Sequence, residues 1–397
     1  MLSLSMIVRD EAAQIEACLQ SVQGFVDEMV VLDTGSTDNT IALAEAMGAR
    51  VETMVWPGDF APARNQALST LQGNWVLVLD ADERLLPEAW EPLRQLMADP
   101  ALLVINLLRH ERGAVQSPYS NVSRLFRRHP AIHWSRAYHS MIDDSVSDLL
   151  QREPHWQIAD CPVPAIAHDG YRPELLAQGN KAQRLREAME AELRERPGDP
   201  YACAKLGSLE VAEGKRSRGL ALLRTGLQHC PPEAHPERYE LLLHLAIAEA
   251  ASDPSAAAGY YQQALALPLA PRLTLAAALN LAALLLQHGQ LESAAQLAQQ
   301  ITAAAPEIGL GWYNLGLIRR RQGDLSAALE AYRTARRCSP EHAETHQNLA
   351  VALLLGGDIE GARNSFCSAI TLLEAQGRSR EAQQLRQQAG NLVKLEA

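Results

Sequence analysis

The sequence of 397 residues lacks several features that would assign it to common classes of protein. Its six cysteines form no C-x-x-C pair, which argues against a zinc site and a disulfide framework and predicts reduced thiols. A net charge of -11 gives no electrostatic basis for binding nucleic acid or an anionic membrane. Residues 1–11 contain no signal-peptide core, and the apolar stretch 273–286 is too short to span a bilayer. We therefore expect a cytoplasmic protein with no transmembrane segment and no nucleic-acid partner.

The residues that are present fall into two halves with different hydrophobic patterns. Up to about residue 135, short β-rich runs alternate with helical stretches. The alternation predicts an α/β domain with a mostly parallel sheet, whose ligands lie beyond the carboxyl ends of the strands. The expected strands are 2–8, 29–33, 50–55, 76–80 and 102–108, and the expected helices are 11–22, 37–47, 61–71 and 87–97.

The second half contains helical patterns alone, with a fixed period of 34 residues. The same residue types recur one period before and one period after a central repeat, and two less regular repeats precede them. We expect about five helix pairs over residues 199–376, stacked as an all-α superhelix, with a linking helix at 172–198 and a capping helix at 377–397. The central repeat matches the tetratricopeptide spacing at Trp312, Leu315, Gly316, Ala328, Tyr332, Ala335 and Pro340.

Residues 75–83 form the most informative short segment, because five apolar residues lead directly into Asp80, Ala81, Asp82 and Glu83. A strand this apolar belongs in the middle of a parallel sheet and would hold both aspartates at its carboxyl end. Hard divalent cations prefer such oxygen ligands and can bridge them to a diphosphate. The alternative is that Asp82 caps a helix that begins at the next residue.

A second apolar strand ends at Asp33 and is followed by a turn that contains Gly35. Asp33 can accept a hydrogen bond from a base or a ribose, and Ser36 or Thr37 can cap the next helix. The alternative for Asp33 is that it only caps the turn. This segment is not the G-x-G-x-x-G loop of dinucleotide-binding proteins.

Together these segments resemble family 2 glycosyltransferases of the GT-A fold, over residues 1–171. Four motifs occur in family order, at 6–11 (M-I-V-R-D-E), 30–40 (V-V-L-D-T-G-S-T-D-N-T), 61–65 (A-P-A-R-N) and 80–83 (D-A-D-E). Thr34 stands where many relatives have a second acid, which leaves the nucleotide preference open. The resemblance implies that Asp80 and Asp82 bind Mn²⁺ or Mg²⁺ on the donor diphosphate, and that the nucleotide sugar is held by Arg9, Glu11, Asp33, Arg64 and Asp80.

A subgroup of that family continues with W-x-G-x-V-H-E and later H-x-G-Y, followed by tetratricopeptide repeats. Trp134, His139 and the segment 168–171 match these motifs, whereas Arg136 replaces the glycine and Ser140 replaces the glutamate. His139 and His168 are candidate metal ligands beside the aspartates, because imidazole can bind Mn²⁺. The alternative is that each histidine is an ordinary hydrogen-bonded loop residue.

The change to Ser140 matters for catalysis. An inverting transfer needs a carboxylate that takes the proton of the acceptor while the metal neutralises the departing diphosphate. If the glutamate of the motif is that base, its role must pass to Glu111, Asp143 or Asp144. We favour Asp143 or Asp144 as the base.

Asn280, Asn314 and Asn348 occupy the same position in successive repeats, which places them in a line on the concave side of the superhelix. An asparagine ladder can bind the backbone amides of an extended polypeptide, because each side chain both donates and accepts. The alternative is that Asn is simply common at this position of the repeat. Either way, the repeats suggest a peptide, protein or glycan acceptor, or self-association into a homo-oligomer.

The leading hypothesis is a metal-dependent inverting glycosyltransferase that moves a hexose from a nucleotide sugar, with UDP as the expected carrier. The acceptor would be a peptide or protein side chain that the repeats hold. The rival hypothesis is a protein-binding scaffold of tetratricopeptide repeats attached to an impaired transferase. A nucleotidyltransferase is disfavoured, because Arg9 and Glu11 stand where such enzymes usually carry a glycine-rich loop.

Overall fold

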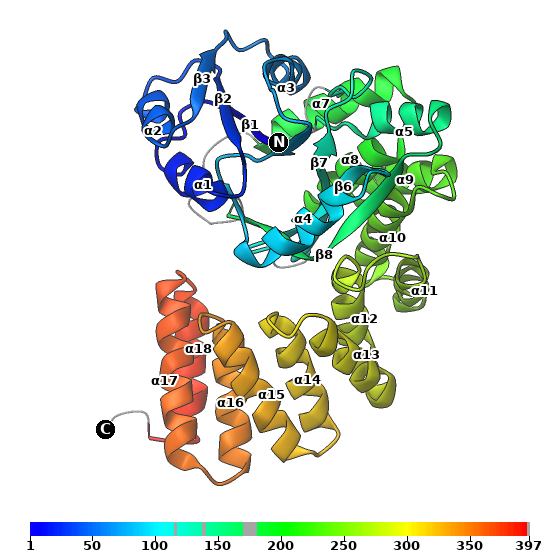
Figure 1. Ribbon diagram of the computed structural model, residues 1–397. Helices are drawn as coiled ribbons and strands as arrows, with labels where there is room; N and C mark the ends of the chain where they lie inside the picture. Colours follow the sequence, from blue (N-terminus) through cyan, green and yellow to red (C-terminus); the bar gives the residue numbers. More distant parts are fainter. Residues whose placement is uncertain (115–116, 137–139, 170–180, 395–397) are drawn as a thin grey trace. The chain divides into compact units, whose positions relative to one another are not determined.

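The computed structural model describes residues 1–114, 117–136, 140–169 and 181–394 (Figure 1). The chain divides into two compact units, Met1–Leu209 and Glu210–Ala397. His139 and residues 170–171 of the H-x-G-Y motif lie outside the described residues. None of the described helices combines the length and the apolar character that a membrane crossing requires. None of the six cysteines, all of which lie in the described part of the chain, forms a disulfide.

The described part of the first unit contains an eight-stranded mixed sheet with the strand order β3-β2-β1-β4-β7-β6-β8-β5. Strands β2, β1 and β4 are parallel neighbours, and β3 extends this parallel half beyond β2. Antiparallel pairing joins β4 to β7, β7 to β6 and β8 to β5. The strands are β1 (Leu2–Val8), β2 (Glu28–Asp33), β3 (Arg50–Thr53), β4 (Trp75–Val78), β5 (Glu83–Leu85), β6 (Leu102–Glu111), β7 (Tyr119–Arg127) and β8 (Gln157–His168).

The five strands expected from the sequence are present, with slightly shifted ends. Strands β5, β7 and β8 were not expected. β5 has only three residues, β7 is rich in polar residues, and β8 contains Pro162 and Pro164, which weaken a strand prediction. The α/β fold class is confirmed, and the unexpected strands make the sheet mixed.

Helices cover both faces of the sheet. Neighbouring residues of a strand point to opposite faces, so each apolar strand needs a cover on both sides. Leu77 of β4 packs with Ile15 and Leu93 in one core cluster, which lies under α1 (Ile15–Val22), α2 (Thr40–Ala46) and α4 (Trp90–Ala98). Val76 belongs to a second cluster with Val146, under α3 (Phe60–Ser69) and α5 (Asp143–Arg152). This doubly covered sheet holds the carboxyl ends of its parallel strands at one fixed edge.

Two helices, α7 (Lys181–Glu195) and α8 (Pro200–Ala212), follow the sheet, and the described part of the second unit is helical (Figure 1). α12, α14 and α16 begin at residues 275, 309 and 343, which reproduces the period of the sequence. A Cβ atom on Gly316 would lie 2.6 Å from the buried ring of Tyr332, so glycine allows α14 to pack closely on α15. The remaining helices are α9 (Arg216–His229), α10 (His235–Glu249), α11 (Pro254–Leu265), α12 (Leu275–Gln287), α13 (Leu291–Ala304), α14 (Gly309–Arg321), α15 (Leu325–Cys338), α16 (Ala343–Leu355), α17 (Ile359–Ala375) and α18 (Ser379–Gly390).

Candidate functional site

Asp33 and Asp80 lie at the same edge of the sheet, because β2 and β4 both run parallel to β1. Asp33 is 2% exposed, and its Oδ1 accepts hydrogen bonds from the backbone N–H groups of Gly35 and Ser36, both at 2.9 Å. Its Oδ2 is buried and has no hydrogen-bond partner within the part of the chain that the structure describes. Since a buried acceptor without a partner is costly, this oxygen is suited to a donor group on a ligand.

Asp80 is held between two arginines. Its Oδ1 accepts a hydrogen bond from Arg64 Nη2 at 2.8 Å, and its Oδ2 lies 2.8 Å from Arg124 Nη2. Burial alone would raise the pKa of Asp80, but the guanidinium groups of Arg124 and Arg64 outweigh it and hold that pKa well below its usual range. Asp80 is therefore ionised and fixed in orientation.

Glu83 is fully buried and organises the arginines beneath the site. Its Oε1 accepts from Arg109 Nη1 and its Oε2 from Arg124 Nη1, both at 2.7 Å. The backbone N–H of Asp80 also donates to Oε2, at 2.9 Å. Glu83 thus links strand β5 to the arginines of β6 and β7, and it sets the position of Asp80.

Asp82, His168 and Glu111 form a chain of hydrogen bonds at the end of β8. The Nε2 of His168 lies 3.2 Å from Asp82 Oδ2, and its Nδ1 lies 2.5 Å from Glu111 Oε2. This contact follows from the strand register, in which His168 is the partner of Glu83 on one side and of Glu111 on the other. The N-cap alternative for Asp82 is wrong, because Glu83 begins strand β5.

Protonation of this chain follows from its contacts. Burial would lower the pKa of His168, but the hydrogen bonds with Asp82 and Glu111 outweigh it and raise the pKa to about 9. Burial would likewise raise the pKa of Glu111, but His168 and Arg109 lower it to about 2. Without a cation, His168 is therefore an imidazolium between two carboxylates, and a cation at Nε2 would displace its proton.

Two family models match the chain, Glycosyl transferase family 2 at residues 3–157 and Tetratricopeptide repeat at residues 313–379. A TPR repeat-containing protein of Synechococcus elongatus is 44% identical over 384 residues, which cover 96% of this chain and 95% of that protein. Residues 3–157 therefore belong to glycosyl transferase family 2, and the chain as a whole belongs with this TPR repeat-containing protein. An uncharacterized glycosyltransferase of Rickettsia bellii is 30% identical over 154 residues, which cover 36% of this chain and 52% of that protein.

Among solved structures, MamA from Desulfovibrio magneticus covers 50% of this chain and 99% of its own length. The identity is 24% and the TM-score is 0.37, which is too low to add to the family assignment. The family models confirm the expected glycosyltransferase and its tetratricopeptide repeats.

In the glycosyltransferase half, the A-P-A-R-N segment packs directly against Trp134. The Asn65 side chain and the Trp134 backbone exchange two hydrogen bonds, at 2.8 and 2.9 Å. The guanidinium of Arg64 lies 4.7 Å from the centre of the Trp134 ring, and its Nε is buried without a partner. The two motifs therefore orient Arg64 toward Asp80.

The candidate base residues lie in different surroundings. Asp144 accepts hydrogen bonds from Ser135 at 2.8 Å and from Arg136 at 3.3 Å, and these contacts outweigh burial and lower its pKa. Asp143 is exposed and accepts from Ser123 at 2.9 Å. Ser140 Oγ is buried and has no hydrogen-bond partner among the described residues, which exclude 137–139. Asp143 thus keeps more of its carboxylate free than Asp144 does.

The backbone conformation at Arg136 explains why the subgroup motif has a glycine at this position. Its φ angle is 66°, in the left-handed region that favours glycine. The side chain spans from Asp144 to Asp199, whose oxygens it contacts at 3.1 and 3.2 Å, and lies over the ring of Tyr201. These contacts offset the backbone strain and tie the motif to the start of α8.

Arg9 and Glu11 follow β1 at the same edge. Arg9 is largely exposed and lies 3.9 Å from Asp10. Burial and the charges of Asp82 and Asp80 raise the pKa of Glu11 to about 7. Both residues thus border the site. The structure also places Glu83, Arg109 and Arg124 in the site. An arginine within the largely apolar strand β6 was a signal for Arg109, since it requires a buried partner, whereas Arg124 lies in the polar strand β7 and gave no such signal.

Glu11 makes the stability of the cation-free enzyme depend on pH. An acid with a raised folded-state pKa loses stability as pH rises from its ordinary value of 4.5 to about 7. The shift is worth about 3 kcal/mol unscreened and about 1 kcal/mol for a partly exposed group. We expect Glu11→Gln to raise the free energy of unfolding by about 1 kcal/mol at pH 8 and by much less at pH 5, as measured by urea denaturation. Equal effects at both pH values would contradict this assignment.

Two of the three asparagines of the ladder make hydrogen bonds within the repeats. Asn348 Nδ2 donates to the Tyr313 hydroxyl at 3.2 Å, and Asn348 Oδ1 accepts from Arg320 at 3.1 Å. Asn280 forms a hydrogen bond with Tyr261, and Asn314 is 8% exposed. These bonds show that asparagines at this position help to pack the repeats. A peptide-binding role stays a prediction.

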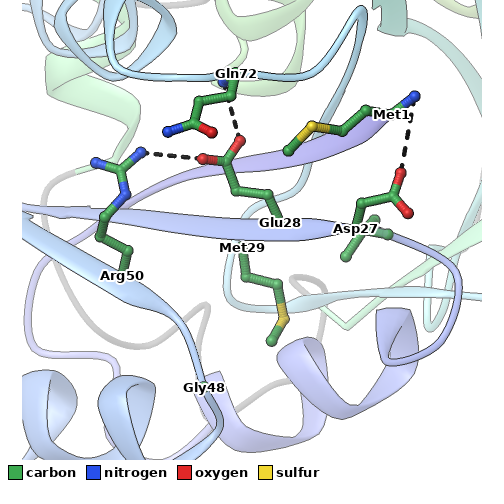
Figure 2. Close-up of a pocket in the computed structure, with 8 residues that line it drawn as sticks. Met1, Asp27, Glu28, Met29, Gly48, Arg50 and Gln72 are labelled. Carbon is green, nitrogen blue, oxygen red and sulfur yellow. Dashed lines mark hydrogen bonds and ion pairs between the residues drawn. The ribbon is translucent and has the colours of Figure 1, made fainter.

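A shallow cavity of about 370 Å³ lies at the opposite edge of the sheet, near the start of β1, β2 and β3. Figure 2 shows that its charged groups are paired with one another. Glu28 lies 3.2 Å from Arg50, and Asp27 lies 3.9 Å from the amino group of Met1. The cavity is far along the strands from Asp33 and Asp80, so it is separate from the candidate site.

Within the described residues, no group of three or more His, Cys, Asp and Glu side chains is arranged to hold a metal ion by itself. The site instead offers two ligand atoms that face each other, Asp82 Oδ2 and His168 Nε2. Such a partial set suits a cation that takes its other ligands from a diphosphate and water.

Proposed function

We propose that this glycosyltransferase moves a hexose from a UDP-sugar to an acceptor in a reaction that depends on Mn²⁺ or Mg²⁺. The single observation that carries the proposal is the pair formed by Asp82 and His168. Two atoms 3.2 Å apart have the spacing of neighbouring ligands on one cation about 2.1 Å from each. Glu111 behind His168 fixes the orientation of the ring, as carboxylates commonly do for metal-binding histidines.

Asp80 completes the diphosphate end of the site in this proposal. Both of its oxygens bind guanidinium groups, and each keeps a lone pair that can reach the cation or its water. Arg64 and Arg124 lie beside the same carboxylate and add positive charge where the departing diphosphate collects negative charge. His139 joins the ligand set on sequence grounds alone.

The nucleotide end is formed by Asp33, Arg9 and Glu11. Uracil carries an N3–H donor, and Asp33 Oδ2 is a buried acceptor with no other partner. Arg9 is exposed and free to approach a phosphate or ribose. A uracil base therefore fits this end of the site, which supports UDP as the carrier.

Transfer proceeds by direct displacement. The base removes a proton from the acceptor, the acceptor atom forms a bond to the anomeric carbon, and the bond from that carbon to the diphosphate breaks on the opposite face. The cation, when bound, neutralises the leaving nucleoside diphosphate. We assign the base role to Asp143, since Asp144 is tied to Arg136. We assign peptide or protein binding to the repeats, with Asn280, Asn314 and Asn348 as contact residues.

Removal of the cation tests this function. We expect purified full-length protein with Mn²⁺ to release UDP slowly from UDP-glucose or UDP-N-acetylglucosamine, and EDTA to lower that rate at least tenfold until Mn²⁺ is restored. The reason is that the leaving diphosphate loses its counter-charge. A rate that EDTA leaves unchanged would refute metal dependence. No release from any UDP-sugar would favour the impaired transferase.

A further inference from the structure

An exposed aromatic loop, residues 54–60, joins β3 to α3. Val55 is 89% exposed, Phe60 is 37% exposed and Trp56 is partly exposed. The rings of Trp56 and Phe60 pack edge to face, with their centres 4.9 Å apart at an angle of 72°. Large apolar side chains that remain at the surface together commonly mark a binding site.

The loop leaves the sheet directly beside Asp33. Thr53 is the strand partner of Asp33, and the backbone N–H of Met54 donates to the carbonyl of Asp33 at 2.9 Å. Trp56 therefore lies two residues after Met54, which is bonded to Asp33, and Asp33 Oδ2 has no partner among the described residues.

The other end of the loop leads to Asp80. Phe60 begins α3 and lies one turn before Arg64, so the two side chains share a face of the helix. Arg64 in turn binds Asp80 at 2.8 Å. The loop with the aromatic pair thus connects the segment beside Asp33 to the helix that carries Arg64.

Two features hold the loop in place. Asp59 caps α3 by accepting a hydrogen bond from the Ala61 N–H at 2.7 Å. Gly58 has a φ angle of 85°, which makes the preceding turn possible without strain. These features hold the backbone of the loop at its α3 end, which reduces the entropy that binding must overcome.

We propose that Trp56 and Phe60 form a stacking surface for the pyrimidine base of the donor, and this rests on the proposed function. Asp33 binds the edge of the base, while the aromatic pair covers its face. Stacking of an aromatic ring on the face of a base increases the affinity for the nucleotide but does not distinguish one base from another. The contact of Asp33 with the edge of the base would therefore give specificity, and the aromatic pair would give affinity.

The test compares UDP with inorganic pyrophosphate, which has no base, by calorimetry on the full-length protein with Mn²⁺. We expect Trp56→Ala to weaken UDP binding about 10- to 100-fold and to change pyrophosphate binding less than about twofold. Trp56→Phe should restore most of the affinity for UDP. The matched control is Val55→Ala in the same loop, which should bind both ligands as the unmodified protein does.

The outcomes separate the two proposals. If Asp82→Ala abolishes UDP binding while Trp56→Ala and Phe60→Leu bind UDP normally, the metal-dependent function stands and the stacking surface is refuted. If both aromatic variants weaken UDP and pyrophosphate equally, the loop acts on the site as a whole and stacking is also refuted. If the unmodified protein binds neither ligand with Mn²⁺, the proposed function itself is wrong.

Discussion

Replacing Asp82 by alanine should lower sugar transfer by roughly 10²- to 10³-fold and leave the fold intact. The variant removes one of two atoms that face each other across 3.2 Å at the end of β8, so the proposed cation would lose a ligand and would neutralise the leaving diphosphate less well. The measurement is the turnover number for UDP release with saturating Mn²⁺. The side chain is partly exposed, so little stability should be lost.

The matched control for this variant is Asp148→Ala, because Asp148 is an exposed aspartate on α5. It should retain full turnover. His168→Ala should reduce turnover less than Asp82→Ala, and both should require more Mn²⁺ for half-maximal rate. Full activity of Asp82→Ala, or an unchanged Mn²⁺ requirement, would contradict the assignment of the ligand pair.

Replacing Glu83 by glutamine should destabilise the glycosyltransferase unit by about 3–5 kcal/mol, since it breaks a buried charge network by removing one partner. Glu83 is fully buried and accepts hydrogen bonds from Arg109 and Arg124 at 2.7 Å. Glutamine keeps the volume but carries no charge, and its NH₂ group would face a guanidinium. Urea denaturation followed by circular dichroism measures the loss.

Glu88→Gln provides the control, because Glu88 is exposed in the same segment and should change stability by less than about 0.5 kcal/mol. The affinity for UDP, which depends on the position of Asp80, provides a second readout. In Glu83→Gln the backbone N–H of Asp80 loses a charged acceptor, so UDP affinity in the presence of Mn²⁺ should also fall. A loss of stability below about 1 kcal/mol would show that the arginines find other partners.

The parallel half of the sheet could be predicted because local patterns specify it. β1 matches its expected range, and Asp33 and Asp80 lie where apolar runs end. The repeats were equally readable, since positions such as Leu281, Leu315 and Leu349 recur after 34 residues. Both predictions depend on neighbours in sequence, which hydrophobic periodicity records.

The antiparallel strands β7 and β8 and the contacts they create could not be predicted in that way. β7 carries Arg124, whose partner Glu83 is 41 residues away, and β8 carries His168, which is 86 residues from Asp82. Nothing in the local pattern of either strand specifies these partners. The asparagine ladder was predicted from phase alone, and only the packed repeats show that Asn348 binds Tyr313 and Arg320.

From its order of residues alone, the chain specifies a sheet edge with acidic side chains and a series of helix pairs, because apolar periodicity and motif spacing are local properties. Tertiary structure alone decides that Asp80 lies between two arginines, that His168 faces Asp82 and that Asp33 keeps an unpartnered oxygen. The physical reason is that charge pairing, burial and ligand spacing depend on distances between segments remote in sequence, and folding sets those distances.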